Sequence, residues 1–221
     1  ETAHRRAGAG GRREAAMDPR SEWLEADGLG GFASGTAGGV RTRRYHALLL
    51  HARRPPSERM VLVNGFDAWL DRDAGSCALS SQAYLPDVVH PDGAARIAAF
   101  ASDPWPRWRF ALADGTVVEQ EIFVPRGAAA VVVRWRLLAH PAGGPAGLRI
   151  RPFLSGRDYH ALHHENPVAR LEPEADGDRL RWQPLPAASG DSNVVRSAAA
   201  PFGSLRTSIR PGRGCTGNPN A

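Results

Sequence analysis

The chain has 221 residues, enough to bury a substantial hydrophobic core, and a formal net charge of +5. All 28 basic side chains are arginine, so chemistry that requires a lysine is excluded. The sequence has no apolar run of about 18 residues, and its first residues lack the apolar stretch of a signal peptide. We therefore expect a cytoplasmic protein with no membrane partner.

The excess positive charge lies near the two ends of the chain. Residues 1–20 hold five arginines and three acidic residues, and residues 187–221 hold four arginines and one aspartate. The segment from 21 to 186 carries 19 arginines and 19 acidic residues. Because a nucleic-acid site needs a clustered basic surface, this balance predicts no nucleic-acid partner.

In chain order, residues 1–20 are predicted to be a disordered leader, in which Met17 is a candidate start. Residues 21–186 have the pattern of a β domain, with apolar runs of strand length at 46–50 and 60–64. Residues 108–124 indicate a hairpin that turns at Asp114 and Gly115, since an Asp-Gly pair favours a tight turn.

Three later segments alternate between apolar and polar residues, which is typical of half-buried strands. They are 128–138, 148–154 and 179–183, and we expect Trp135 and Trp182 to lie in the core. Repeated turn signals and the absence of alternating βα units predict an all-β, antiparallel sandwich or barrel. Residues 187–221 have no periodicity and predict a disordered tail, or a tail read in a shifted frame.

A glycine-rich segment, residues 28–49, raises the question of a ligand site. A phosphate-binding loop is excluded because its lysine is missing. A dinucleotide loop is disfavoured, since a weak strand precedes the glycines and a poor helix follows them. Two interpretations stay open. One is a structural loop that uses positive φ angles, and the other is a loop that brings Arg43, Arg44, Tyr45 and His46 to a polyhydroxylated ligand.

The same segment resembles the N-terminal part of the bacterial and archaeal type of glycogen debranching enzyme. The matching positions are Glu22, Trp23, Leu24, Gly28, Gly30, Gly31, Ala33, Ser34, Gly35, Thr36, Thr42, Arg43, Tyr45, His46, Leu48 and Leu49. The departures are Asp27 in place of Asn, Phe32 in place of Tyr, and Ala47 in place of Gly. Residues 90–110 and 148–166 are similar to two further motifs of the family, so the likeness extends from Glu22 to Trp182.

The resemblance implies an antiparallel β-sandwich of the supersandwich type, which in this family precedes an (α/α)6 barrel. That barrel carries the amylo-α-1,6-glucosidase chemistry, with one carboxylate as general acid and another that activates water. We expect this chain to be truncated at its C-terminus and to lack the barrel, so that it is inactive alone. Accordingly, no catalytic role is assigned to Asp87, Asp92, Asp158 or Glu165.

The expected role is therefore that of an accessory domain that contacts α-glucan, either glycogen or limit dextrin. The candidate substrate-binding residues are Arg43, Tyr45, His46, Arg157, Asp158 and His160. The alternatives are a free-standing carbohydrate-binding module and a non-functional truncated product.

Three smaller expectations concern single side chains. No cofactor or metal is expected, because His160 and His164 lack a third ligand and Cys77 and Cys215 lack paired spacing. Arg157 and Asp158 are expected to form a buried pair within a hydrogen-bonded loop. For Trp105 and Trp108, packing in the core or at a sheet edge is favoured over a role as a stacking platform for sugar.

Overall fold

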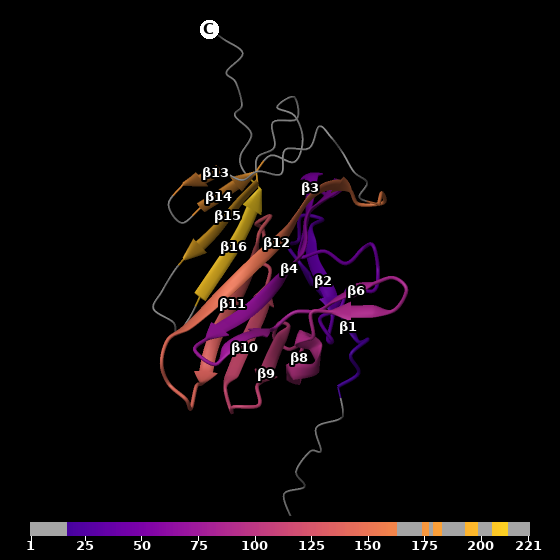
Figure 1. The fold of residues 1–221 in the computed structure, drawn as a ribbon. Coiled ribbons are helices and arrows are strands. Elements are labelled where there is room, and N and C mark those ends of the chain that lie inside the picture. The colour runs from indigo at the N-terminus through magenta and orange to yellow at the C-terminus, as the bar shows by residue number, and fades with distance from the viewer. Residues whose placement is uncertain (1–16, 163–173, 177–178, 183–192, 199–204, 212–221) are drawn as a thin grey trace, which may run out of the picture.

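The computed structural model describes residues 17–162, 174–176, 179–182, 193–198 and 205–211 (Figure 1). Among these residues no helix is long and apolar enough to cross a membrane. The described elements are strands, apart from one short 3₁₀ turn, η1 (Gly93–Arg96). The predicted all-β class with antiparallel pairing is confirmed.

The strands form two large antiparallel sheets and one small hairpin. The six-stranded sheet has the order β1-β2-β3-β4-β12, and β5 also pairs with β4. Its strands are β1 (Glu22–Ala26), β2 (Phe32–Thr36), β3 (Leu49–Arg54), β4 (Ser57–Arg72), β5 (Gly75–Ala78) and β12 (Ala146–Asp158).

The eight-stranded sheet has the order β13-β14-β15-β16-β11-β10-β9-β8. Its strands are β8 (Ile97–Ala101), β9 (Arg107–Ala111), β10 (Val117–Phe123), β11 (Val131–Ala139), β13 (Glu174–Asp176), β14 (Arg179–Trp182), β15 (Asn193–Ala198) and β16 (Leu205–Pro211). The small hairpin consists of β6 (Gln82–Tyr84) and β7 (Val88–His90).

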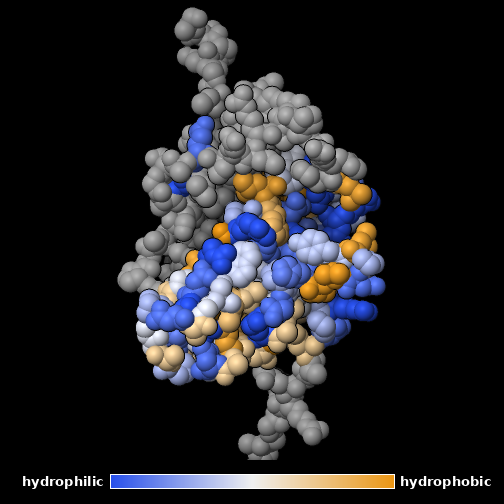
Figure 2. All heavy atoms as spheres, in the orientation of Figure 1, coloured by the Kyte–Doolittle hydropathy of each residue, from blue (hydrophilic) through white to orange (hydrophobic). Residues whose placement is uncertain are grey.

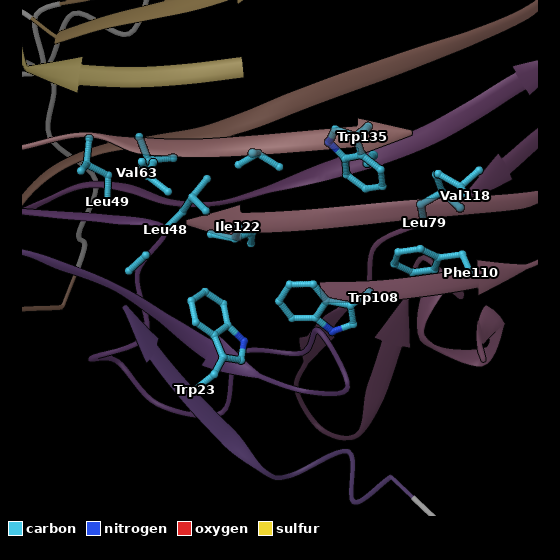
Figure 3. Packing of buried hydrophobic residues seen from close by; sticks show 14 of the residues in the cluster. Trp23, Leu48, Leu49, Val63, Leu79, Trp108, Phe110, Val118, Ile122 and Trp135 are labelled. Atoms are coloured by element: carbon cyan, nitrogen blue, oxygen red, sulfur yellow. The ribbon is translucent and has the colours of Figure 1, made fainter. Parts of the chain in front are cut away.

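The hydrophobic core lies between the two large sheets, in the arrangement of a sandwich. Val63 and Leu70 of β4 belong to the same buried cluster as Trp108 of β9 and Trp135 of β11. Figure 3 shows Val63, Trp108 and Trp135 in this cluster. Burying one such side chain completely contributes about 1.5–3 kcal/mol to stability. On the visible outer surface, hydrophobic residues form separate patches among hydrophilic ones (Figure 2).

Two predicted strand patterns are confirmed. In β11 the side chains of Val131, Val133 and Trp135 are buried, and the residues between them are more exposed. The β9–β10 hairpin turns at the predicted position, where Gly115 has a φ of 81°. Residues 179–182 of the predicted strand form β14, but the side chain of Trp182 lies outside what the structure describes.

The opposite face of β10 carries acidic side chains. Glu119 and Glu121 are almost completely buried, yet they point away from the core that Val118 and Ile122 enter. Arginines of the neighbouring strands cover them: Arg134 binds Glu121, and Arg109 binds Glu119 at 3.1 Å. Pairing with charges of opposite sign lowers the free-energy cost of burying Glu119 and Glu121. Both faces of β10 can therefore be buried.

The backbone differs from the sequence prediction at both ends. Strands β15 and β16 lie within the segment 187–221, where the composition predicts disorder, and β16 pairs with the edge of β11. Backbone pairing to an open strand edge needs no particular composition, which explains why the pattern did not reveal it. At the other end, Pro19 of the predicted leader accepts a 2.9 Å hydrogen bond from the amide of Gly38.

Candidate functional site

The glycine-rich segment begins as the loop of a β-hairpin, between β1 and β2. The buried carboxylate of Asp27 accepts hydrogen bonds from the amides of Leu29, at 2.6 Å, and Gly31, at 2.9 Å. Gly30 has a φ of 102°, and a Cβ there would come within 2.7 Å of the backbone of Pro56. Residues 27–31 therefore form a structural loop, and the side chain of Asp27 stabilises its turn.

The loop after β2 carries three of the candidate residues, and one of them is buried. The side chain of His46 is only 5% exposed, and its Nδ1 accepts a 3.2 Å hydrogen bond from the amide of Thr42. Its Nε2 lies 3.5 Å from Oε1 of Glu22, and Nε of Arg43 donates to that same oxygen at 2.5 Å. Burial lowers the pKa of His46, while Glu22 opposes that shift. His46 therefore holds the loop in place and is not open to a ligand.

The end of β12 and the turn that follows it carry the other three candidates. Arg157 reaches across to the loop after β2, where its Nη2 donates to the carbonyl of Arg44 at 2.5 Å. Its Nη1 also donates to the carbonyls of Tyr159, at 3.3 Å, and Ala161, at 2.9 Å. Burial lowers the pKa of Arg157, and the nearby Arg44 lowers it further. Arg157 thus acts as a clamp between two segments that are distant in sequence.

The expected buried pair of Arg157 and Asp158 is wrong. Asp158 is exposed, and its carboxylate accepts the amide of His160 at 2.8 Å. The guanidinium of Arg157 is directed to main-chain carbonyls, including that of Asp158 at 3.3 Å. Since neighbouring side chains on a strand point to opposite faces, an adjacent pair is poorly placed to meet.

The clamp brings together an aromatic cluster made of Tyr45, Tyr159 and His160. The ring centroids of Tyr45 and Tyr159 lie 4.7 Å apart, and those of Tyr159 and His160 lie 4.8 Å apart. Phe32 of β2 packs edge-on against Tyr159, at 6.1 Å. His160 is exposed, and the two tyrosines are half-buried. The cluster is therefore a partly exposed aromatic surface with a packed base.

Arginine side chains surround the aromatic cluster. The guanidinium of Arg44 lies 4.8 Å from the ring centroid of Tyr45, and its Nη2 donates to the Tyr45 hydroxyl at 2.9 Å. Arg59 of β4 lies 5.9 Å from the ring of Tyr159. Such cation–π contacts hold flat donors beside an aromatic face. The sequence placed Arg44 beside the glycine-rich loop. It did not identify Tyr159 and Arg59 as site residues, although Tyr159 lies inside one of the motifs that carry the resemblance.

The remaining candidates lie elsewhere or serve the core. Trp108 is 3% exposed and its Nε1 donates to the carbonyl of Ala37 at 2.7 Å, so it is a core residue, while Trp105 packs against Phe123 at 5.4 Å. Asp92 is ion-paired with Arg96 at 2.6 Å. In the described ranges no three His, Cys, Asp or Glu residues gather as a metal site. His164, Glu165 and Cys215 lie outside the described residues.

The comparison with protein families decides the family. Residues 21–199 match the family model described as "Glycogen debranching enzyme N terminal". The chain belongs to this family. The match confirms the resemblance read from the sequence, and it continues past residue 186 to include strand β15. A search of curated proteins found no match.

Proposed function

We propose that this domain contributes an α-glucan contact to glycogen debranching and performs no hydrolysis by itself. The observation that carries the proposal is the aromatic cluster of Tyr45, Tyr159 and His160, held together by the Arg157 clamp and flanked by Arg44. The family of debranching enzyme N-terminal domains supports glucan as the ligand class.

The chemistry of the cluster suits a sugar chain. The faces of pyranose rings are apolar enough to pack on tyrosine rings, while guanidinium and hydroxyl groups meet the ring hydroxyls. Asp158, which directly precedes Tyr159, offers a further acceptor. Arg43 is 64% exposed, although its Nε is already paired with Glu22. Hydrolysis of α-1,6 branch points requires two carboxylates flanking the scissile bond, and we assign these to the catalytic part of a debranching enzyme.

Affinity electrophoresis in gels that contain glycogen tests the glucan contact. We expect glycogen to retard the 221-residue chain, and Tyr159→Ala to weaken retardation, since stacking contacts contribute about 0.5–1.5 kcal/mol beyond area. The matched control is Tyr84→Ala, because Tyr84 is 52% exposed and lies on the β6–β7 hairpin outside the cluster. Migration that glycogen does not change, or equal retardation of the two variants, would contradict the proposal.

A second assay tests the absence of hydrolysis. The purified chain is incubated with limit dextrin, and released glucose is measured. We expect none above the blank, whereas release of glucose would contradict an accessory role. A chain that neither binds glycogen nor stays monomeric would favour the alternative of a non-functional product over both the accessory domain and a free-standing carbohydrate-binding module.

A further inference from the structure

The thiol of Cys77 lies against the guanidinium of a buried arginine. Cys77 belongs to β5, pairs with Leu70 of β4, and packs against the main buried cluster while it stays partly exposed. Nη2 of Arg72 donates a hydrogen bond to its Sγ at 3.1 Å. Neither residue belongs to the aromatic cluster, so the pair is separate from the proposed glucan contact.

Arg72 joins the two large sheets at one end of the sandwich. It is the last residue of β4, and its side chain is only 6% exposed. Its Nη1 is ion-paired with the carboxylate of Asp114 and donates to the hydroxyl of Thr116 at 3.2 Å. Both partners lie in the connection between β9 and β10. These bonds hold the guanidinium in one orientation.

The edge of this guanidinium that faces Cys77 has one vacant donor. Nε and Nη2 form one edge of the planar group, and their N–H bonds point in the same direction. Nη2 has Sγ of Cys77 as its acceptor, whereas Nε is buried and has no partner among the described residues. A buried donor without an acceptor is costly in free energy, so an additional acceptor atom beside Sγ would stabilise the fold.

Arg149 shows what the same edge of a guanidinium binds when both donors are used. Its Nε donates to Oδ2 of Asp71 and its Nη2 to Oδ1, both at 3.1 Å. The fork thus takes two neighbouring acceptor atoms. A thiol offers one acceptor atom, whereas a sulfur that carries an oxygen offers two. The edge of Arg72 therefore fits an oxidised Cys77 better than the thiol.

A second arginine lies near the sulfur. Arg96 is ion-paired with Asp92 and donates to the carbonyl of Ala78, the residue after Cys77, at 3.4 Å. The pKa of Arg96 is raised chiefly by its hydrogen bond with Asp92, and the nearby Cys77 adds to this rise. Partial exposure and basic neighbours are the features of cysteines that react with oxidants.

We propose that Cys77 is a site of reversible oxidation by a peroxide and that Arg72 holds the sulfenic acid product. With hydrogen peroxide, the sulfur attacks one oxygen, an S–O bond forms and the O–O bond breaks. The departing hydroxide takes the thiol proton and leaves as water, so the sulfur is oxidised by two electrons and the peroxide is reduced. The new oxygen accepts the hydrogen bond of Nε.

The first test is intact-protein mass spectrometry of the full chain with Cys215→Ser, in which Cys77 is the single cysteine. We expect hydrogen peroxide to add one oxygen atom at Cys77 and dithiothreitol to remove it. Oxygen added to methionine is not removed by dithiothreitol, so the two products are distinguishable. The control is the same chain with Cys77→Ser, which should gain no oxygen that dithiothreitol removes.

The second test concerns the fork of Arg72. Arg72→Lys keeps the positive charge but removes the paired donors, so oxidation of Cys77 should be at least about tenfold slower, the effect of one charge-assisted hydrogen bond. Oxidation should raise the unfolding temperature of the parent chain by about 2–4 °C and should not raise that of Arg72→Lys. The control is Arg109→Lys, since Arg109 binds Glu119 on the face that points away from the core.

Three results would overturn the proposal. They are the absence of a reversible gain of oxygen at Cys77, equal oxidation rates in Arg72→Lys and its parent, and a lower unfolding temperature of the parent after oxidation. If Arg72→Lys does not fold, Cys77→Asp decides the question, because a carboxylate places two oxygens on a fork as Asp71 does on Arg149. Cys77→Asp should unfold at a higher temperature than Cys77→Ser, and an equal or lower temperature would contradict the role of Arg72.

Discussion

The aromatic cluster and the inter-sheet cavity treat their polar groups in opposite ways. Around the cluster, the guanidinium of Arg157 donates hydrogen bonds to main-chain carbonyls, and the carboxylate of Asp158 accepts one from the amide of His160. At the cavity between the two large sheets, which Arg41 lines, Nη1 of Arg41 is buried and has no partner in the described part of the chain. Polar groups with hydrogen-bond partners hold a surface in one shape. A buried polar group without a partner lowers the stability of the fold, and a ligand that bonds it removes that loss.

The difference also separates stability from binding. The cluster stands on two segments that are held together largely by one arginine, so its geometry should be lost when that clamp is lost. The cavity stands on the core itself, because Trp108 and Ile122 belong to the main buried cluster. Changes to the cavity walls should therefore affect the whole fold more than changes at the cluster.

The largest effect is expected for Trp108→Ala. Truncation of this buried indole should lower the free energy of unfolding by about 3–5 kcal/mol, as for other large core aromatics. Below its unfolding temperature the variant should keep its retardation by glycogen, because Trp108 lies outside the aromatic cluster. Urea denaturation measures the first effect. Trp105→Ala is the control, and an equal loss there would contradict the assignment of Trp108 to the core.

A smaller effect is expected for Arg157→Ala, which acts on the aromatic cluster rather than on the core between the sheets. Removal of a partly buried guanidinium that bonds several carbonyls should cost about 2 kcal/mol. Retardation by glycogen should fall, because Tyr159 and Tyr45 are no longer held together. Unchanged retardation in a folded variant would contradict the role of Arg157 as a clamp.

The smallest effect concerns pH and sharpens the view that His46 is structural. Because burial lowers the pKa of His46 below its usual 6.5, the unfolded chain binds a proton more readily than the folded one. The stability that neutral His46 contributes is present above pH 6.5 and is lost as pH falls through the lowered pKa. Unfolding by urea at pH 7.5 and pH 5 should show this decrease, and His46→Gln should reduce it. An unchanged pH profile in His46→Gln would assign the decrease to other groups.

Local patterns carried much of the fold. The alternation around Val131, Val133 and Trp135 identified β11 and its core face, and Asp114–Gly115 identified a hairpin turn. Both patterns depend on neighbouring residues alone, so they can be predicted from the sequence. Strands β15 and β16 were not legible, because they form by backbone pairing to β11 and β14 rather than through an apolar pattern of their own.

The candidate site was predicted as a set of residues but not as a geometry. The motifs included Tyr45, His46 and His160, yet they could not show that His46 is buried while His160 is exposed. The contact between Arg157 and the carbonyl of Arg44 joins positions 113 residues apart. Nothing in the local sequence of Arg157 distinguishes an arginine that meets sugar from one that clamps two loops.

By itself, the sequence determined the all-β class, the main strand faces and the debranching enzyme family, because these follow from short-range periodicity and from motifs. Tertiary structure decided which of those residues meet. The parity of β10 places Gln120 on the core face. Only the opposing sheet, with Trp23, and the loop after β2, with Arg41, make that position part of a cavity wall. The physical reason is that a strand pattern specifies which face is buried, whereas the partner surface determines how completely each part of that face is filled.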